Sequence, residues 1–211
     1  MIFFYAEDFN MTKTLKNLLK IVTLSLPLLI LFSCKSVPKK QTLNLSRKLM
    51  DKGQLSSRQL AEYFLSQNPD YEDSDFIYEF AQFYVDEAAA EGINSDAAFA
   101  QMCLETGYLR FGNLVQPEFH NYCGLGAMDA EHPGETFETV QLGVRAHIQH
   151  LQAYATTEEI KLNNELIDPR YNWVHKTKFT EDIFGLTGTW ATDPEYGSKI
   201  DRILTEMEEV N

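Results

Sequence analysis

The segment Ser95–Gly107, with the sequence SDAAFAQMCLETG, decides how this chain is expected to fold. Ser95 is a favourable N-cap residue and Gly107 a favourable residue directly after a helix, so the segment predicts one short helix. Apolar side chains fall on every face of this helix, which indicates that it is buried. Only Gln101 and Glu105 interrupt them, and because they stand at i and i+4 they share one side of the helix.

Glu105 is unusual because a carboxylate is costly to ionise among apolar side chains. It also lies in the last turn of the predicted helix, where the helix dipole disfavours an anion. Both effects raise the pKa of a carboxyl group, and a carboxylic acid that stays protonated near neutral pH can act as a general acid. The alternative is a glutamate at a helix end that simply reaches solvent.

The composition is that of a soluble globular domain. The chain has 211 residues, of which 44% are hydrophobic and 23% charged, with a formal net charge of −13. This acidity excludes binding to the phosphate backbone of nucleic acids, because proteins that bind it carry a basic surface. It is compatible with an uncharged or partly cationic glycan-peptide substrate, and solubility alone explains it equally well.

The N-terminal region predicts a lipoprotein signal peptide. Three lysines precede the apolar run Ile21–Phe32, which is too short to span a bilayer comfortably. The run ends in Leu-Phe-Ser before Cys34, which resembles a bacterial lipobox whose cysteine becomes the lipid-modified N-terminus. Met11 is the expected true start. The alternatives are an uncleaved signal anchor and a buried helix.

Three parts follow from this pattern: a signal peptide over 1–34, a tether over 35–54 and a folded domain over 55–211. The lipid on Cys34 predicts attachment to a membrane of the cell envelope, and we expect the outer membrane of a Gram-negative bacterium. Which face of that membrane the protein occupies stays open.

The folded part predicts a single, mainly α domain with a small irregular or β lobe. The lobe corresponds to Leu109–Glu138, which is rich in glycine and proline and has room for a short hairpin at Pro133. The expected helices are Ser56–Gln67, Ser74–Gly92, Ser95–Gly107, Val140–Tyr154, Glu158–Leu166, Phe179–Phe184 and Pro194–Glu209.

Cysteine and histidine patterns predict no metal site and no cofactor. Cys103 and Cys123 do not form a CxxC pair, and whether they form a disulfide stays open. His147 and His150 are not part of an HExxH motif.

Three motifs occur in order: AQMCLETG at 100–107, NYCGLG at 121–126 and WATDPEY at 190–196. Together they resemble the bacterial peptidoglycan glucosaminidases (glycoside hydrolase family seventy-three), whose pattern runs roughly A-Q-x-x-L-E-[ST]-G, N-x-[FY]-G-[IL], Y-A-T-D-P-x-Y. The resemblance covers about Phe76–Met207. Three motifs in order are more specific than the first alone.

This resemblance implies a lysozyme-like α-helical fold that cleaves the β-1,4 bond after N-acetylglucosamine in peptidoglycan glycan strands. Glu105 is then the general acid that protonates the glycosidic oxygen as an oxocarbenium-like transition state forms. Two alternatives stay open. One is a lytic transglycosylase acting on the same strands, and the other is a non-catalytic lipoprotein that binds glycan.

The second catalytic group is less clear from the resemblance. Some members of the family have a second carboxylate after the second motif, and others are argued to use the acetamido group of the substrate with a supporting tyrosine. Here Asp129, Glu131 and Glu135 are candidate carboxylates that do not align cleanly with the pattern, and Tyr196 is a candidate phenol. Trp190 replaces the first tyrosine of the third motif, so a phenol is lost there.

The motifs also imply substrate-binding residues, namely Gln101, Asn121, Tyr122, Gly124 and Trp190. Trp190 can stack on a sugar face, and glycine at position 124 allows close backbone approach to a ligand. Each has a structural alternative. Gln101 can bond its own surroundings, and Asn121 and Tyr122 can hold the turn.

Overall fold

The structure, a computed structural model, describes residues 43–112 and 114–210. The predicted signal peptide, the lipidation site Cys34 and the first part of the tether lie outside these residues. No helix within them is long and apolar enough to cross a membrane.

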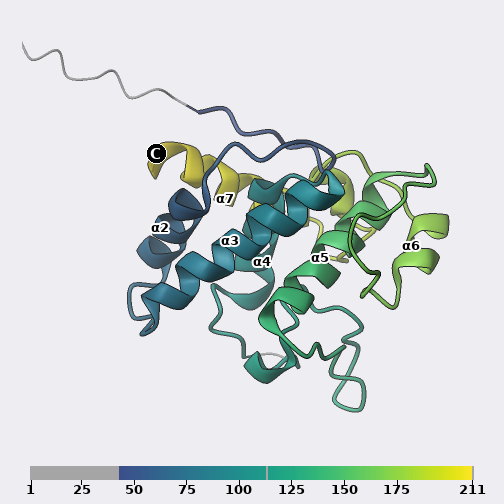
Figure 1. Cartoon of the computed structure of the whole chain (residues 1–211), viewed down its shortest axis with the longest axis horizontal. Helices are drawn as coiled ribbons and strands as arrows, with labels where there is room; N and C mark the ends of the chain where they lie inside the picture. Colours follow the sequence, from purple (N-terminus) through teal and green to yellow (C-terminus); the bar gives the residue numbers. More distant parts are fainter. Residues whose placement is uncertain (1–42, 113, 211) are drawn as a thin grey trace, which may run out of the picture. The chain divides into compact units, whose positions relative to one another are not determined.

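Six α-helices form most of the regular structure of the described residues, with two short 3₁₀ helices (Figure 1). They are α2 Ser57–Gln67, α3 Ser74–Glu91, α4 Ser95–Thr106, η1 Pro117–Phe119, α5 Val140–Ala155, α6 Tyr171–Thr177, η2 Phe184–Leu186 and α7 Tyr196–Val210.

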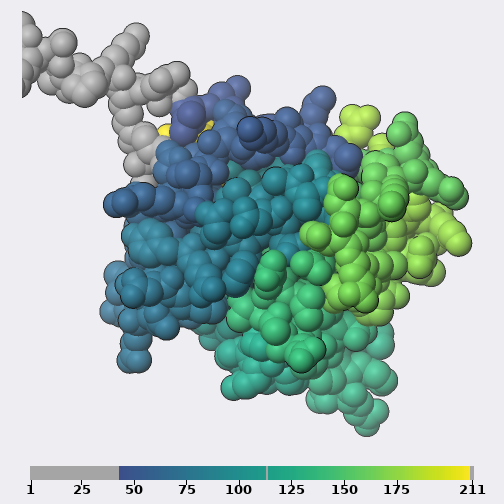
Figure 2. Space-filling model, viewed as in Figure 1, coloured from purple at the N-terminus to yellow at the C-terminus, as the bar shows by residue number. Residues whose placement is uncertain are grey.

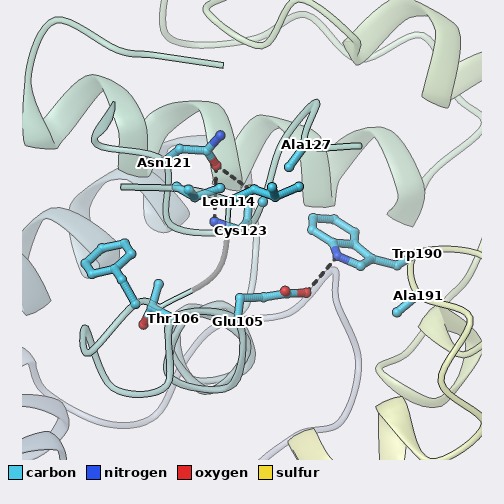
Figure 3. Close-up of a pocket in the computed structure, with 11 residues that line it drawn as sticks. Glu105, Thr106, Leu114, Asn121, Cys123, Ala127, Trp190 and Ala191 are labelled. Carbon is cyan, nitrogen blue, oxygen red and sulfur yellow. Dashed lines mark hydrogen bonds between the residues drawn. The ribbon is translucent and has the colours of Figure 1, made fainter. Parts of the chain in front are cut away.

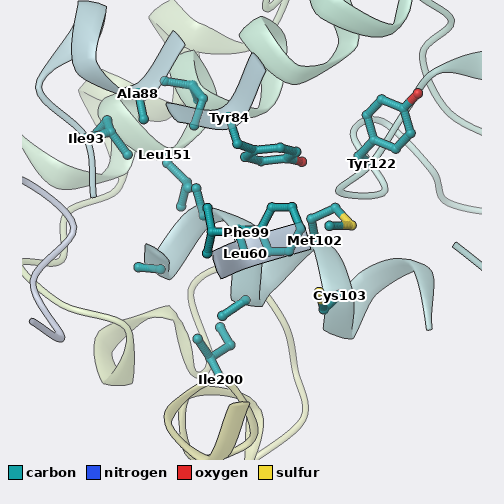
Figure 4. Close-up of a cluster of buried hydrophobic side chains, with 14 of the residues drawn as sticks. Leu60, Tyr84, Ala88, Ile93, Phe99, Met102, Cys103, Tyr122, Leu151 and Ile200 are labelled. Carbon is teal, nitrogen blue, oxygen red and sulfur yellow. The ribbon is translucent and has the colours of Figure 1, made fainter. Parts of the chain in front are cut away.

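Helix α4 is the central element of the hydrophobic core. Every residue from Ser95 to Cys103 is buried, as its all-round apolar pattern predicts. It packs against α2, α3, α5 and α7. Phe99 meets the rings of Phe64 and Tyr84 edge to face, and Figure 4 shows Phe99 and Met102 within this cluster. The position of the last turn of α4 is therefore fixed by four other helices.

Asn94, and not Ser95, is the N-cap of α4. Its side-chain oxygen accepts hydrogen bonds from the backbone N–H of Asp96 and Ala97, while its amide nitrogen donates to the carbonyls of Ser46 and Lys48 at 2.9 and 3.0 Å. The same residue thus starts the central helix and holds the N-terminal segment against it. At the start of α2, Ser56 and Gln59 form a capping box.

Residues 43–54, which we expected to be part of a tether, pack against the helices instead. Leu45 and Leu49 are buried, and Arg47 forms ion pairs with Asp201 and Glu208 of α7 at 2.6 and 2.5 Å. Figure 2 shows these first described residues, in blue, beside the yellow-green surface of residues near 180. The packed domain therefore begins earlier than residue 55.

The helix predicted at Glu158–Leu166 is wrong, because this segment is irregular. The backbone N–H groups of Asn163 and Asn164 donate to the Glu91 carboxylate at 3.1 and 2.9 Å. A side chain at the end of α3 therefore satisfies donors that a helix would have used.

The helix predicted at Phe179–Phe184 is also wrong. There the backbone pairs with the N-terminal segment, since Leu49 N–H donates to the Glu181 carbonyl and Ile183 N–H to the Arg47 carbonyl. Conversely, α6 is a helix in a segment for which the sequence predicted none. Its first turn follows Asp168, whose carboxylate accepts from the Arg170 N–H at 2.8 Å.

The expected β lobe is not seen, because residues 43–112 and 114–210 contain no strand. At the predicted hairpin there is only an isolated bridge between Asp129 and His132. The Asp129 carboxylate accepts from the N–H groups of Glu131 and His132, which closes a tight turn without extending a ladder. The fold is therefore mainly α, with an irregular segment between α4 and α5.

Both cysteines of the described region, Cys103 and Cys123, are buried and free, so the pairing left open by the sequence does not occur in this structure. Within the described residues no group of three or more His, Cys, Asp or Glu side chains is arranged to hold a metal ion.

The two roles of Asn94 predict an unusually large loss of stability on its removal. Asn94→Ala removes a cap and leaves two backbone carbonyls without their donor, which together should lower the free energy of unfolding by about 3 kcal/mol. The matched control is Asp73→Ala at the exposed N-cap of α3, which should cost about 1 kcal/mol. Urea denaturation measures both, and equal losses would contradict the second role of Asn94.

Candidate active site

Glu105 lies in the last turn of α4 and lines a cavity of about 300 Å³. The irregular segment supplies one side of the cavity through Leu114, Cys123 and Gly124, and Trp190 supplies another. In Figure 3 the Glu105 carboxylate points toward the indole nitrogen of Trp190. The first and third sequence motifs therefore meet at this carboxylate.

One carboxylate oxygen of Glu105 accepts two hydrogen bonds. Trp190 Nε1 donates to Oε1 at 3.0 Å, and the Tyr196 hydroxyl donates to the same oxygen. Among the described residues no donor contacts Oε2, and a Cβ at Gly124 would lie 4.0 Å from that atom. Oε2 is therefore the oxygen that can carry a proton toward a bound ligand.

The pKa of Glu105 is raised, first because burial penalises the charged carboxylate. The hydrogen bonds from Tyr196 and Trp190 favour the ionised form and act in the opposite direction, without reversing the shift. The direction expected from the sequence is confirmed, and burial is its main cause. Such a carboxyl group suits the role of a general acid.

Behind Glu105 a chain of buried hydrogen bonds runs into the core. Gln101 Nε2 donates to the Tyr196 hydroxyl at 2.8 Å, and Gln101 Oε1 lies 3.0 Å from His147 Nε2. Because an amide oxygen only accepts, His147 Nε2 must carry the proton. His147 Nδ1 is then free to accept from the Tyr84 hydroxyl at 2.9 Å. Burial lowers the pKa of His147 to about 3, so the ring is neutral as this pattern requires.

All donors in this chain point toward Glu105. Tyr84 donates to His147, His147 to Gln101, Gln101 to Tyr196, and Tyr196 to Glu105. Each group therefore fixes the rotamer and the donor direction of the next one. Tyr196 is held in place from behind, and its single proton is committed to the carboxylate.

Asn121 organises the turn that forms the wall opposite Glu105. Its side-chain oxygen accepts from the Leu125 N–H at 2.9 Å, and its amide donates to the carbonyls of Leu125 and Glu135 at 2.9 and 3.0 Å. Gly124, at the tip of the turn, has a left-handed φ of +69°, which favours glycine. The turn therefore presents backbone to the cavity.

Helix α5 supports this wall from behind. A Cβ at Gly143 would lie 1.7 Å from the His120 carbonyl oxygen, so only glycine lets α5 approach the chain at that point. The residue before Asn121 is thereby packed directly on a core helix.

The predicted substrate-binding residues divide into two groups. Gly124, Trp190 and Asn121 line the cavity. Gln101 and Tyr122 do not, because Gln101 is 1% exposed and Tyr122 packs edge to face on Phe80, with ring centroids 4.7 Å apart. The indole N–H of Trp190 also donates a hydrogen bond to Glu105, and the contact expected of its ring with a sugar would be a separate one.

None of the candidate second carboxylates is among the residues that line this cavity. Asp129 is exposed and paired with His132 at 2.9 Å, and Glu131 is exposed. Glu135 is half-buried, with its carboxylate beside Gly126. Tyr196 is the one candidate that touches Glu105.

Residues 81–209 match the protein family Glucosaminidase, described as mannosyl-glycoprotein endo-beta-N-acetylglucosaminidase, over more than half of the chain. The chain belongs to the glucosaminidase family. A protein of Borreliella burgdorferi (strain B31), named only as an uncharacterized protein, is 40% identical over 163 residues, which are 77% of this chain and 78% of that relative. No solved structure matches the chain.

The part that matches the glucosaminidase family contains Glu105 and all its hydrogen-bonding neighbours. Membership makes the chain a relative of glycoside hydrolases and indicates peptidoglycan as the substrate.

Nothing in the sequence indicated Tyr84, and the histidine pattern raised His147 only as a possible metal ligand. Tyr84, Gln101 and His147 lie on α3, α4 and α5. The distances along the sequence, 63 and 46 residues, carry no local signal of their contact. The signal that could have indicated this role is the position of His147 on an otherwise apolar face of the helix predicted at Val140–Tyr154.

Burial of Glu105 should make this glucosaminidase-family protein less stable as the pH rises. The pKa of Glu105 is higher in the folded than in the unfolded state. In acid the carboxyl group is protonated in both states, and as the pH rises it ionises first in the unfolded chain. Stability present at low pH is therefore lost as the pH rises through the folded pKa. Thermal unfolding of Glu105→Gln should show a gain over the parent that grows from pH 4 to pH 8. A gain independent of pH would contradict this account.

Removing the hydroxyl of Tyr196 should raise the pKa of Glu105 further, because that bond stabilises the charged form. A ¹³C NMR titration of the glutamate carboxyl groups, assigned with Glu105→Gln, measures the shift in Tyr196→Phe. The control is Tyr154→Phe, since the Tyr154 hydroxyl donates to the Thr189 carbonyl and not to Glu105. A lower or unchanged pKa in Tyr196→Phe would show that the bond does not favour the carboxylate.

Proposed function

We propose that this protein is an endo-β-N-acetylglucosaminidase that hydrolyses the β-1,4 bond after N-acetylglucosamine in peptidoglycan glycan strands. The observation that carries the proposal is the half-buried Glu105, with one oxygen held by two donors and the other facing a cavity. Membership of the glucosaminidase family supports the substrate class. The lysozyme-like fold implied by the motifs stays a prediction.

In the proposed reaction Glu105 begins as the protonated acid. Its Oε2 gives the proton to the glycosidic oxygen, so the leaving sugar departs as an alcohol while positive charge develops at C1 of N-acetylglucosamine. The carboxylate left behind is stabilised by the Tyr196 hydroxyl and the Trp190 N–H, whose bonds to Oε1 strengthen as charge appears.

The lining of the cavity favours a mechanism with one protein carboxylate. With Asp129, Glu131 and Glu135 outside the lining, C1 is attacked by the acetamido oxygen of the same sugar, and water then opens the resulting ring. Glu105, now a carboxylate, takes the proton from that water. Tyr196 keeps its hydrogen bond to Glu105 throughout and is not itself a nucleophile.

Loss of the acid should abolish turnover. Glu105→Gln should lower the release of reducing N-acetylglucosamine ends from purified sacculi by at least about 100-fold, since general acid catalysis typically contributes that much. Asp129→Asn, Glu131→Gln and Glu135→Gln serve as controls and should retain activity. An active Glu105→Gln variant would refute the assignment. A dead control variant would identify a second carboxylate.

A lytic transglycosylase is the second candidate function. Among the described residues, Glu105 is the one carboxylate that lines the cavity, and that reaction also needs only one acid. Mass spectrometry of digested sacculi separates the two reactions. Hydrolysis leaves reducing N-acetylglucosamine ends, while the transglycosylase leaves anhydro-muramic ends. We further propose attachment to the cell envelope, as the outer membrane lipoprotein expected from the lipobox-like Cys34.

A further inference from the structure

A second cavity, of about 240 Å³, adjoins the one that contains Glu105. The two share the lining residues Cys123, Gly124, Ala127 and Trp190, so they are neighbouring parts of one recess. Helices α5 and α6, which pack on each other and lie side by side in Figure 1, supply most of the remaining lining of the second cavity together with the two cap residues of α6, Arg170 and Lys178. A glycan bound over Glu105 would therefore extend toward it.

Two cations in this second cavity have no carboxylate partner. Five basic side chains of the described residues are half-buried. Arg47, Arg145 and Lys199 each form an ion pair with a carboxylate. Arg170 and Lys178 form none within the described part of the chain, and both line the second cavity. Two half-buried cations without a carboxylate partner in one cavity can both donate charge-assisted hydrogen bonds to an anion.

The local charge contrasts with the chain as a whole. The formal net charge is −13, yet no acidic side chain lines the second cavity. Asp168, which precedes α6 and does not line the cavity, is buried and bonds His150 Nδ1 at 2.8 Å and the Arg170 N–H. Its charge is already used within the protein, which leaves the side chains of Arg170 and Lys178 for a ligand.

The rim of this cavity also suits a glycan. Trp173 is 53% exposed, and the Arg170 guanidinium lies over its ring, 5.6 Å from the centroid. The cation–π contact holds the guanidinium beside an exposed aromatic surface. Aromatic surfaces of this kind bind sugar faces or aliphatic chains.

We propose that this second cavity binds the carboxylate-bearing lactyl substituent of the muramic acid residue next to the scissile bond. The identity of the ligand rests on the proposed function. In peptidoglycan every second sugar carries a lactyl ether, whose acid is either free or extended by a peptide that itself ends in carboxylates. Arg170 and Lys178 give charge-assisted hydrogen bonds to such a carboxylate. A neutral glycan of N-acetylglucosamine alone has no group for them.

Binding of small probes tests this without turnover. In the full chain with Glu105→Gln, we would measure by calorimetry the dissociation constants of N-acetylmuramic acid, muramyl dipeptide and chitotetraose. Arg170→Gln and Lys178→Gln should each weaken the binding of a carboxylate probe by about tenfold and leave chitotetraose unchanged. Lys176→Gln, at an exposed cation of α6 outside the cavity, is the matched control and should change none of them.

The pattern of losses identifies the source of the carboxylate. A loss for N-acetylmuramic acid alone assigns the free lactyl carboxylate, and a loss for muramyl dipeptide alone assigns the carboxylate of the peptide. Losses for both show that the two cations accept either carboxylate. Equal losses for chitotetraose, no loss for any probe, or no binding of either acidic probe by the Glu105→Gln parent would overturn the proposal. Digestion of sacculi by the wild type tests the proposed function separately. The protein can hydrolyse glycan strands without binding the carboxylate probes in this pattern, and it can bind the probes in this pattern without hydrolysing the strands.

Discussion

The site depends on holding the carboxyl group of Glu105 inside an apolar environment while one of its oxygens faces a cavity. Burial raises its pKa, and two donors on the other oxygen limit the cost of that burial. Both donors, Trp190 and Tyr196, come from the segment leading into α7 and from its first residue. The packing of α7 on α4 therefore places both donors on Glu105, in addition to its part in the core.

The polar chain behind this contact shows how the fold keeps it in one arrangement. Tyr84, His147 and Gln101 are buried, and each is satisfied by the next. A buried chain in which every donor has one acceptor has few alternative arrangements of similar energy. Since these residues come from three helices, the core that gives the domain its stability also orients the acid.

The recess around the acid has two parts that differ in their chemical groups. One cavity contains the acid and the turn held by Asn121, and the other contains two unpaired cations beside an exposed tryptophan. Trp190 lies at the boundary and lines both. In a chain with a net charge of −13, this local positive region differs from the acidic surplus of the rest of the chain, and it suits the anionic ligand that we propose for it.

The sequence by itself determined the features that depend on neighbouring residues: the buried helix α4, the glycine that ends it, the raised pKa of Glu105 and the family motifs. The sequence wrongly predicted a helix at Glu158–Leu166, where the Glu91 carboxylate accepts from backbone N–H groups that a helix would have used. It also wrongly predicted a β lobe. It did not assign Tyr84 or the cation pair of Arg170 and Lys178. Only the tertiary structure decided these, because they depend on which distant side chains meet and which charges are left without a partner.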